Sequence, residues 1–288
     1  MHADCAFYTG KTHAVCQDYA RIGDRDGLPF VAISDGCSGS IDTDIGSRLL
    51  AISASNLLRV KTYALEDRGG ISEFPTRVAE TARVLVSAIG LDQQCLDSTL
   101  IIAAVQSDNG VKKVNCRMYG DGAIIAKKKN GGISLYTGDF TTGVPYYLSY
   151  LLNEQRLEAW WNLATAEGGL EKIVRRSVFH HDGNQFVNQN NQTDFFLAED
   201  MSFRISFVKD NYDWVCIASD GIHTFVEKTP EHAFNPIPTP EVVNQMFAFK
   251  NYTGLFVQRR IGRYMRDAVK TNIQHDDDFA VAGIYLGD

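Results

Sequence analysis

The chain has 288 residues, of which 44% are hydrophobic, enough to bury the core of one large domain or two small ones. Its net charge of −7 disfavours a nucleic-acid surface, and no apolar run is long enough to cross a bilayer or to mark a signal peptide. The six cysteines show no C-x-x-C spacing, which fits reduced thiols better than disulfides or a zinc site. We therefore expect a cytoplasmic protein that binds neither nucleic acid nor a membrane.

The first half of the chain alternates short apolar runs with two helical patterns. Strands are predicted over residues 5–8 and over the run that ends at Asp35. Apolar residues recur at helical spacing over 43–61 and 76–89. Short Gly and Asn turns then separate four predicted strands, over 98–106, 111–119, 123–128 and 133–136. Such turns indicate antiparallel hairpins.

The second half continues with helices, a loop and further strands. Helices are predicted over 146–164 and 170–177, an exposed polar loop over 180–192, and strands over 195–198, 203–208 and 214–218. Four of the seven prolines fall within 229–240, which indicates an irregular connection before helices over 240–249 and 255–269 and a last strand over 279–286. This order predicts two packed antiparallel sheets whose outer faces are covered by helices.

Acidic residues follow or precede several of these strands. Two apolar runs end in the same tripeptide, Ser-Asp-Gly, at 34–36 and 219–221, and three acids at 276–278 precede the last strand. Carboxylates that several strand ends bring to one sheet edge repel one another unless a cation lies between them. The sequence therefore predicts an acidic metal site.

The candidate ligands are all oxygen donors, which suit Mg²⁺ or Mn²⁺ better than zinc. They are Asp18, Asp35, Asp121, Asp220 and the three acids at 276–278. Two such ions can share a water, lower its pKa and stabilise the leaving oxygen of an in-line displacement. This chemistry is typical of phosphoester hydrolysis.

Six short motifs appear in a fixed order along the chain. They are Gln-Asp at 17–18, Ser-Asp-Gly-x-x-Gly-Ser at 34–40, Ser-Thr at 98–99, Gly-Asp-Gly at 120–122, Ser-Asp-Gly at 219–221 and Asp-Asp-x-Ala-Val at 277–281. A lone Asp-Gly is usually a turn, but the ordered series resembles the type 2C metal-dependent protein phosphatases. The Gly-x-x-His at 10–13 and the aromatic segment at 145–150 are closer to a divergent, mostly bacterial branch of that family.

The resemblance implies a set of metal ligands. Asp35 would bridge two Mn²⁺ or Mg²⁺ ions, and the carbonyl of Gly36 would complete one coordination shell. Asp220 and Asp277 would bind the first ion, and Asp18 would hold the second directly or through water. The residues alone do not separate Asp277 from the acids on either side of it.

The resemblance also implies a fold and a third, weaker metal site that includes Asp121. The family fold is a four-layer α-β-β-α sandwich of the α+β class. We expect residues 1–288 to form one such domain, with a helical and loop elaboration around 146–194. Thr224 stands where the family has an aspartate that supports the third metal, so we expect that site to be weak or absent.

Two further departures from the family pattern concern the substrate phosphate. His13 stands where many members have an arginine that binds this phosphate, and a histidine lacks the permanent charge and fork geometry of arginine. Cys37 stands where eukaryotic members have a histidine proposed as general acid, and a neutral thiol is a poor proton donor. His13 or a metal-bound water would then have to take that role.

We therefore expect a monomeric phosphatase that hydrolyses phosphoserine or phosphothreonine in phosphorylated proteins with a water activated by two metal ions. One alternative is a catalytically weak relative that serves as a regulatory or phosphopeptide-binding module. Another is a phosphatase of small metabolites.

One pattern lies outside these motifs. Four basic residues share one face of the last predicted helix, namely Arg259, Arg263, Arg266 and Lys270. Such a stripe either contacts an acidic or phosphorylated partner or is an ordinary solvated helix surface.

Overall fold

The computed structural model describes residues 1–60, 63, 65, 73–140, 143–166, 174–181, 185–189, 196–197, 201–228 and 234–287. Within them a seven-stranded antiparallel sheet contains, in spatial order, β1 (His2–Tyr8), β16 (Phe279–Tyr285), β12 (Tyr212–Ala218), β6 (Gly122–Lys128), β7 (Ile133–Phe140), β8 (Val174–His181) and β9 (Phe186–Asn188). A six-stranded antiparallel sheet contains β10 (Phe196–Leu197), β11 (Ser202–Val208), β5 (Val111–Tyr119), β4 (Leu100–Asp108), β3 (Leu28–Asp35) and β2 (Asp18–Arg25). A small third sheet contains β14 (Asn235–Pro236), β13 (Phe225–Glu227) and β15 (Ile273–His275).

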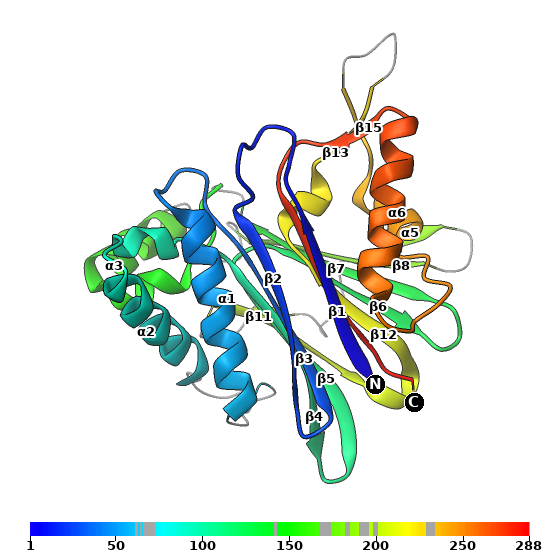
Figure 1. Ribbon diagram of the computed structural model, residues 1–288, viewed down its shortest axis with the longest axis horizontal. Coiled ribbons are helices and arrows are strands. Elements are labelled where there is room, and N and C mark those ends of the chain that lie inside the picture. Colours follow the sequence, from blue (N-terminus) through cyan, green and yellow to red (C-terminus); the bar gives the residue numbers. More distant parts are fainter. Residues whose placement is uncertain are drawn as a thin grey trace.

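Helices cover the outer faces of the two large sheets (Figure 1). They are α1 (Thr43–Val60), α2 (Glu73–Ala88) and α3 (Glu154–Thr165) beside the six-stranded sheet, and α5 (Thr239–Met246) and α6 (Phe256–Lys270) beside the seven-stranded one. Short 3-10 helices connect the elements, namely η1 (Gln93–Leu96), η2 (Leu148–Leu152), η3 (Lys209–Asn211) and η4 (Asp220–His223). The result is the α+β four-layer sandwich that the sequence predicts.

The strand period of two explains why both faces of each sheet are buried. In β12, Val215 and Ile217 belong to the core between the two sheets, whereas Trp214 and Cys216 belong to the core beneath α5 and α6. Successive side chains of a strand point to opposite faces, so an uninterrupted apolar run fills both cores.

The start of α1 is fixed by very close packing. A Cβ atom on Gly46 would lie 1.7 Å from the carbonyl oxygen of Cys95, so only glycine lets the helix come this near to η1. Further along, Leu50, Ala54 and Leu58 form a buried stripe toward the six-stranded sheet. This packing holds the loop between β3 and α1 in place, next to the candidate site.

Two segments differ from the sequence-based expectation. The helix predicted over 170–177 is wrong where the structure describes it, because Val174–His181 forms β8 by pairing with β7. Val178 and Phe179 favour a strand once β7 offers an edge. The loop predicted over 180–192 likewise contains the end of β8 and all of β9. Residues 170–173, 182–184 and 190–192 lie outside the described residues.

The remaining strands have no clear pattern in the sequence, because β2 is rich in polar residues and the strands of the third sheet are very short. β2 was not predicted, and the third sheet consists of strands of only two or three residues. Of the connection predicted over 229–240, residues 229–233 lie outside the described part of the chain, and α5 begins at Thr239. All six cysteines are free thiols, as predicted. In the part of the chain that the structure describes, no helix has both the length and the apolar character needed to cross a bilayer.

Candidate active site

Five of the predicted ligands lie at one edge of the sandwich, the edge at which β1 ends. β2 begins at Asp18 and β3 ends at Asp35, and these two positions are paired across the strands. Asp121 lies in the turn between β5 and β6, Asp220 follows β12, and Asp277 stands two residues before the start of β16. The antiparallel pairing of β6, β12 and β16 brings the last three turns together. We call these five residues the acidic edge.

The carboxylates of the acidic edge are close enough to perturb one another. Asp35 lies close to both Asp18 and Asp220, whose charges act on its carboxyl group. Burial raises the pKa of Asp35 well above its ordinary value, and the charges of its two neighbours raise it further. Burial likewise raises the pKa of Asp18 to about 7, against hydrogen bonds that lower it. The edge therefore binds protons far more readily than isolated aspartates do.

Two carboxylate oxygens at this edge are buried without a hydrogen-bond partner. The Ser219 hydroxyl donates to Asp18 Oδ2 at 2.6 Å and itself accepts the backbone N–H of Ala280 at 2.9 Å. Asp18 Oδ1 has no partner among the described residues, and neither has Asp220 Oδ1. Buried acceptors are normally paired, because leaving one unpaired costs about 1–3 kcal/mol. These oxygens can accept a ligand that the chain itself does not supply.

The donor chemistry of the acidic edge fits a hard divalent cation, although its side chains do not enclose one. Across the described residues, no group of three or more His, Cys, Asp or Glu side chains is arranged so that it could hold a metal ion. Asp35 instead has Asp18 and Asp220 as close neighbours of the same charge. Mg²⁺ and Mn²⁺ prefer oxygen ligands of this kind, but a closed ligand shell would require these carboxylates to turn toward a common point.

Asp121 lies close to Asp139, which in turn lies close to His223. Burial raises its pKa well above the ordinary value, and the charges of Asp220, Asp139 and Asp277 add to this effect. Asp139 Oδ1 lies 3.9 Å from Nε2 of His223, whose Nδ1 is 2.7 Å from the Thr239 hydroxyl. Asp139 stands in no recognisable motif, so no pattern in the sequence is a signal for it. His223 stands two residues after the Ser-Asp-Gly at 219–221, and this position is a signal that it lies near the site.

His13 lies against Asp278, one of the three acids at 276–278. Its Nδ1 lies 2.9 Å from Asp278 Oδ2, and its Nε2 lies 3.6 Å from Asp277 Oδ1. Partial burial lowers the pKa of His13, but the contact with Asp278 and the charges of the nearby acids outweigh it, and the net pKa is raised. Asp278 also accepts the backbone N–H groups of Gly10 at 2.7 Å and Gln17 at 2.6 Å. It thereby fixes the 10–17 loop against β16.

The structure distinguishes the three consecutive acids before β16. Asp278 is 2% exposed, and both its oxygens accept backbone N–H groups. Asp276 accepts a hydrogen bond from the Gln274 side chain at 3.0 Å. The side chain of Asp277 is 39% exposed. Its partial burial raises its pKa, and the charge of Asp220 raises it further. Asp277 lies close enough to Asp220 and Asp121 for their charges to interact.

The glycines of the two Ser-Asp-Gly motifs allow the turns to approach other backbone segments. A Cβ atom on Gly221 would lie 1.8 Å from the carbonyl oxygen of Asp278, and one on Gly36 would lie 2.7 Å from the carbonyl oxygen of Thr43. Each motif therefore needs glycine for close packing within the chain itself. At Gly221 this packing is what brings Asp220 next to Asp277.

A further buried acid lies near the edge but has a full set of partners. Asp97, 4% exposed, accepts hydrogen bonds from Ser149 at 2.6 Å, from Ser40 at 2.8 Å and from Arg156 Nη2 at 2.8 and 2.9 Å. Its carbonyl oxygen accepts the N–H of Cys37 at 2.8 Å. We call Asp97, Ser40, Ser149 and Arg156 the Asp97 anchor. It connects η2 and α3 to the loop after β3. No motif in the sequence predicts this cluster.

Comparisons with known proteins agree with this arrangement. Residues 10–160, just over half of the chain, match the family profile described as Protein phosphatase 2C. No curated protein gives a significant match.

Solved structures share the fold at low sequence identity. The serine/threonine phosphatase Stp1 from Staphylococcus aureus aligns with a TM-score of 0.55 and 10% identity, over 99% of this chain and 95% of that one. The serine/threonine phosphatase of S. agalactiae gives 0.51 and 14%, over 99% of each chain. The Mycobacterium tuberculosis serine/threonine phosphatase PstP/Ppp gives 0.51 and 13%, over 99% and 98%. Together with the profile match, the motifs and the fold, these findings show that the chain belongs to the protein phosphatase 2C family.

Proposed function

We propose that the protein is a metal-dependent phosphatase that hydrolyses phosphoserine and phosphothreonine monoesters in phosphorylated proteins. The observation that carries this proposal is the acidic edge, where five aspartates meet and two buried carboxylate oxygens have no partner among the described residues. Membership of the protein phosphatase 2C family supports the same reaction.

Four aspartates and one backbone carbonyl would hold two Mn²⁺ or Mg²⁺ ions, namely Asp18, Asp35, Asp220, Asp277 and the carbonyl of Gly36. When bound, such ions lower the pKa of a water and neutralise charge on a phosphate. The residues around these ligands hold the carboxylates in position. Ser219 orients the Asp18 carboxylate, and Asp35 lies between its two neighbours.

His13 would act on the substrate phosphate and on the leaving oxygen. Its Nδ1 lies 2.9 Å from Asp278 Oδ2, so Nε2 is the atom left to carry a proton toward the site. The raised pKa makes the protonated ring easier to form than in a free histidine. A proton held at Nε2 can hydrogen-bond a phosphate oxygen and then be transferred to the serine or threonine alkoxide as it leaves.

Asp121 would contribute to a third and weaker site. The Thr224 hydroxyl donates to the carbonyl oxygen of Gly221 at 2.9 Å, so it supports the turn and supplies no carboxylate. We further propose that residues 1–288 form one phosphatase domain that acts as a monomer in the cytoplasm. The core shared by both large sheets supports the single domain.

Manganese-dependent cleavage of p-nitrophenyl phosphate tests the proposal. We expect activity in the wild type, its loss in Asp35→Asn, and its retention in Asp26→Asn, which changes an aspartate that is 91% exposed in a turn. Activity that survives Asp35→Asn would refute the assigned site. Tight binding of a phosphopeptide without any turnover in Mn²⁺ would favour a regulatory module. Cleavage of small phosphate esters but of no phosphopeptide would favour a metabolite phosphatase.

A further inference from the structure

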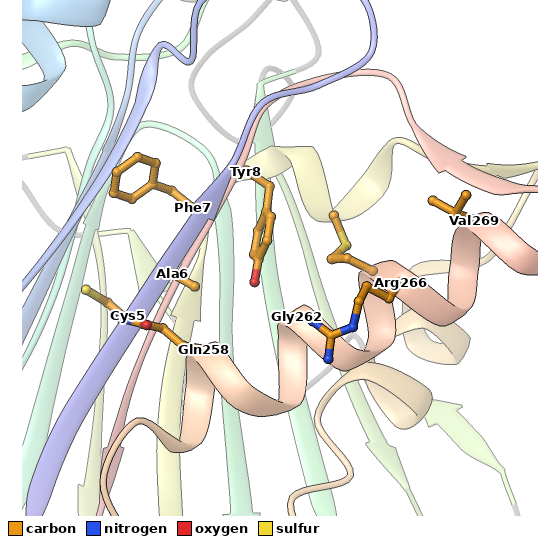
Figure 2. Close-up of a pocket in the computed structure, with 9 residues that line it drawn as sticks. Cys5, Ala6, Phe7, Tyr8, Gln258, Gly262, Arg266 and Val269 are labelled. Atoms are coloured by element: carbon orange, nitrogen blue, oxygen red, sulfur yellow. The ribbon is translucent and has the colours of Figure 1, made fainter.

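A groove separates β1 from α6 on the far side of β1 from β16 (Figure 2). Its volume is about 590 Å³. Among the described strands β1 pairs only with β16, so it forms one edge of the seven-stranded sheet. Unpaired N–H and C=O groups along such an edge can accept another extended chain.

The residues that line the groove show that it follows the strand edge. Four consecutive residues of β1, Cys5, Ala6, Phe7 and Tyr8, all contribute to it. Because successive side chains point to opposite faces, a hollow on one face would be lined by alternate residues only. The opposite wall is a helical stripe of α6, formed by Gln258, Gly262, Met265, Arg266 and Val269.

The two walls are held at a fixed separation. Asp4, 1% exposed, accepts the backbone N–H of Gln258 in the first turn of α6 at 2.9 Å, which anchors the helix start to β1. Further along, a Cβ atom on Gly262 would lie 3.3 Å from the Tyr8 hydroxyl and 3.5 Å from Arg266 Nη1. The groove is therefore open at its centre because residue 262 has no side chain.

One wall carries a cation, Arg266, that forms no ion pair with a described residue. Arg259 donates to the carbonyl oxygens of Asn251 and Thr253, and Lys270 pairs with Asp267 at 2.9 Å. Arg266 is exposed, and no hydrogen bond or ion pair joins its guanidinium to another described residue. An exposed guanidinium in a groove can form a charge-assisted hydrogen bond with a carboxylate of an acidic ligand.

The groove leads toward the acidic edge. A neighbouring hollow of about 330 Å³ shares Tyr8, Met265 and Val269 with it and extends to Lys11 and His275. Lys11 belongs to the loop that carries His13. A segment that lies along β1 would therefore have one end next to the candidate active site.

We propose that the groove between β1 and α6 docks an extended acidic segment of the phosphoprotein substrate, which adds as a strand to β1 and places a carboxylate on Arg266. This inference rests on the proposed function. Main-chain hydrogen bonds to β1 would supply affinity, and the side-chain contact with Arg266 would supply the preference for acidic sequences.

Fluorescence anisotropy with a labelled, unphosphorylated acidic peptide tests the groove without catalysis. We expect Arg266→Glu to weaken binding about fivefold or more, since a charge-assisted contact becomes a repulsion. Gly262→Leu should abolish binding, because its side chain fills the groove while a helix favours leucine over glycine. Arg263→Glu is the matched control, since Arg263 is exposed on the same helix but does not line the groove, and it should change affinity less than about twofold.

A kinetic arm links the groove to turnover. We expect Arg266→Glu to raise the KM for a phosphopeptide with an acidic extension, while its kcat and the cleavage of p-nitrophenyl phosphate stay unchanged. If no substrate is cleaved at all, the proposed function is wrong. The anisotropy experiment then still tests whether the groove binds an acidic peptide. Equal affinity of wild type and Arg266→Glu for the acidic peptide would overturn the docking proposal. So would a dimer in gel filtration that Gly262→Leu dissociates, since the occupant would then be a second copy of the chain.

Discussion

The acidic edge and the Asp97 anchor place buried aspartates beside the same loop but treat them in opposite ways. In the anchor, two hydroxyls and the guanidinium of Arg156 satisfy the Asp97 carboxylate. At the acidic edge, Asp18 has one hydroxyl donor, and Asp35 has other acids as its neighbours. The chain can neutralise a buried carboxylate, so the crowding of Asp18, Asp35 and Asp220 without a cationic partner indicates a place that an external cation stabilises.

The largest expected effect comes from Asp35→Asn. The change should lower manganese-dependent turnover at least about a thousandfold, because it removes the central ligand of the site. In chelator at pH 8, the same change should raise the free energy of unfolding, because an amide ends the repulsion among the acids. Kinetics and urea titration measure the two effects. A loss of stability in chelator would contradict the contrast with the anchor.

The stability of the metal-free protein should fall as pH rises. Asp18 has a pKa of about 7 in the folded chain against an ordinary value of 3.8, so between these pH values the folded state holds more protons than the unfolded one. The free energy of unfolding should therefore decrease from pH 4 to pH 7, by about 3 kcal/mol for this group alone. Urea titrations in chelator measure this slope. An Asp18→Asn variant with the wild-type slope would show that another group is responsible.

Arg156→Ala tests the anchor and should have the reverse outcome to Asp35→Asn. It leaves the buried Asp97 charge unpaired, so the free energy of unfolding should fall by about 3 kcal/mol. The matched control is Arg77→Ala, because Arg77 pairs with Glu80 at 3.7 Å on an exposed helix surface, and it should cost less than about 1 kcal/mol. Equal losses in the two variants would mean that the anchor is no stronger than a surface pair.

The contrast also shows what the sequence could predict. Asp35 and Asp220 could be predicted because each follows an apolar run, typical of a buried strand, and stands in the same Ser-Asp-Gly tripeptide. The partners of Asp97 could not, because Arg156 is distant in sequence and meets it only through the packing of α3. The same holds for Asp278, whose bonds to Gly10 and Gln17 cross almost the whole chain. A sequence shows where carboxylates stand but not which of them are paired.

The smallest expected effect is that of His13→Gln. Glutamine can still hydrogen-bond a phosphate oxygen but cannot transfer a proton, so kcat should fall about tenfold while KM changes little. The fall should be greater for an alkyl phosphate such as phosphoserine than for p-nitrophenyl phosphate, whose leaving group needs no proton. An equal fall for both substrates would assign His13 to positioning alone.

The acidic edge should bind hard divalent cations in solution. Isothermal titration calorimetry of Mn²⁺ into the metal-free protein measures this binding directly. We expect two ions per chain in the wild type and in Asp26→Asn, and loss of binding in Asp35→Asn. Unchanged Mn²⁺ binding by Asp35→Asn, or no binding by the wild type, would contradict the claim.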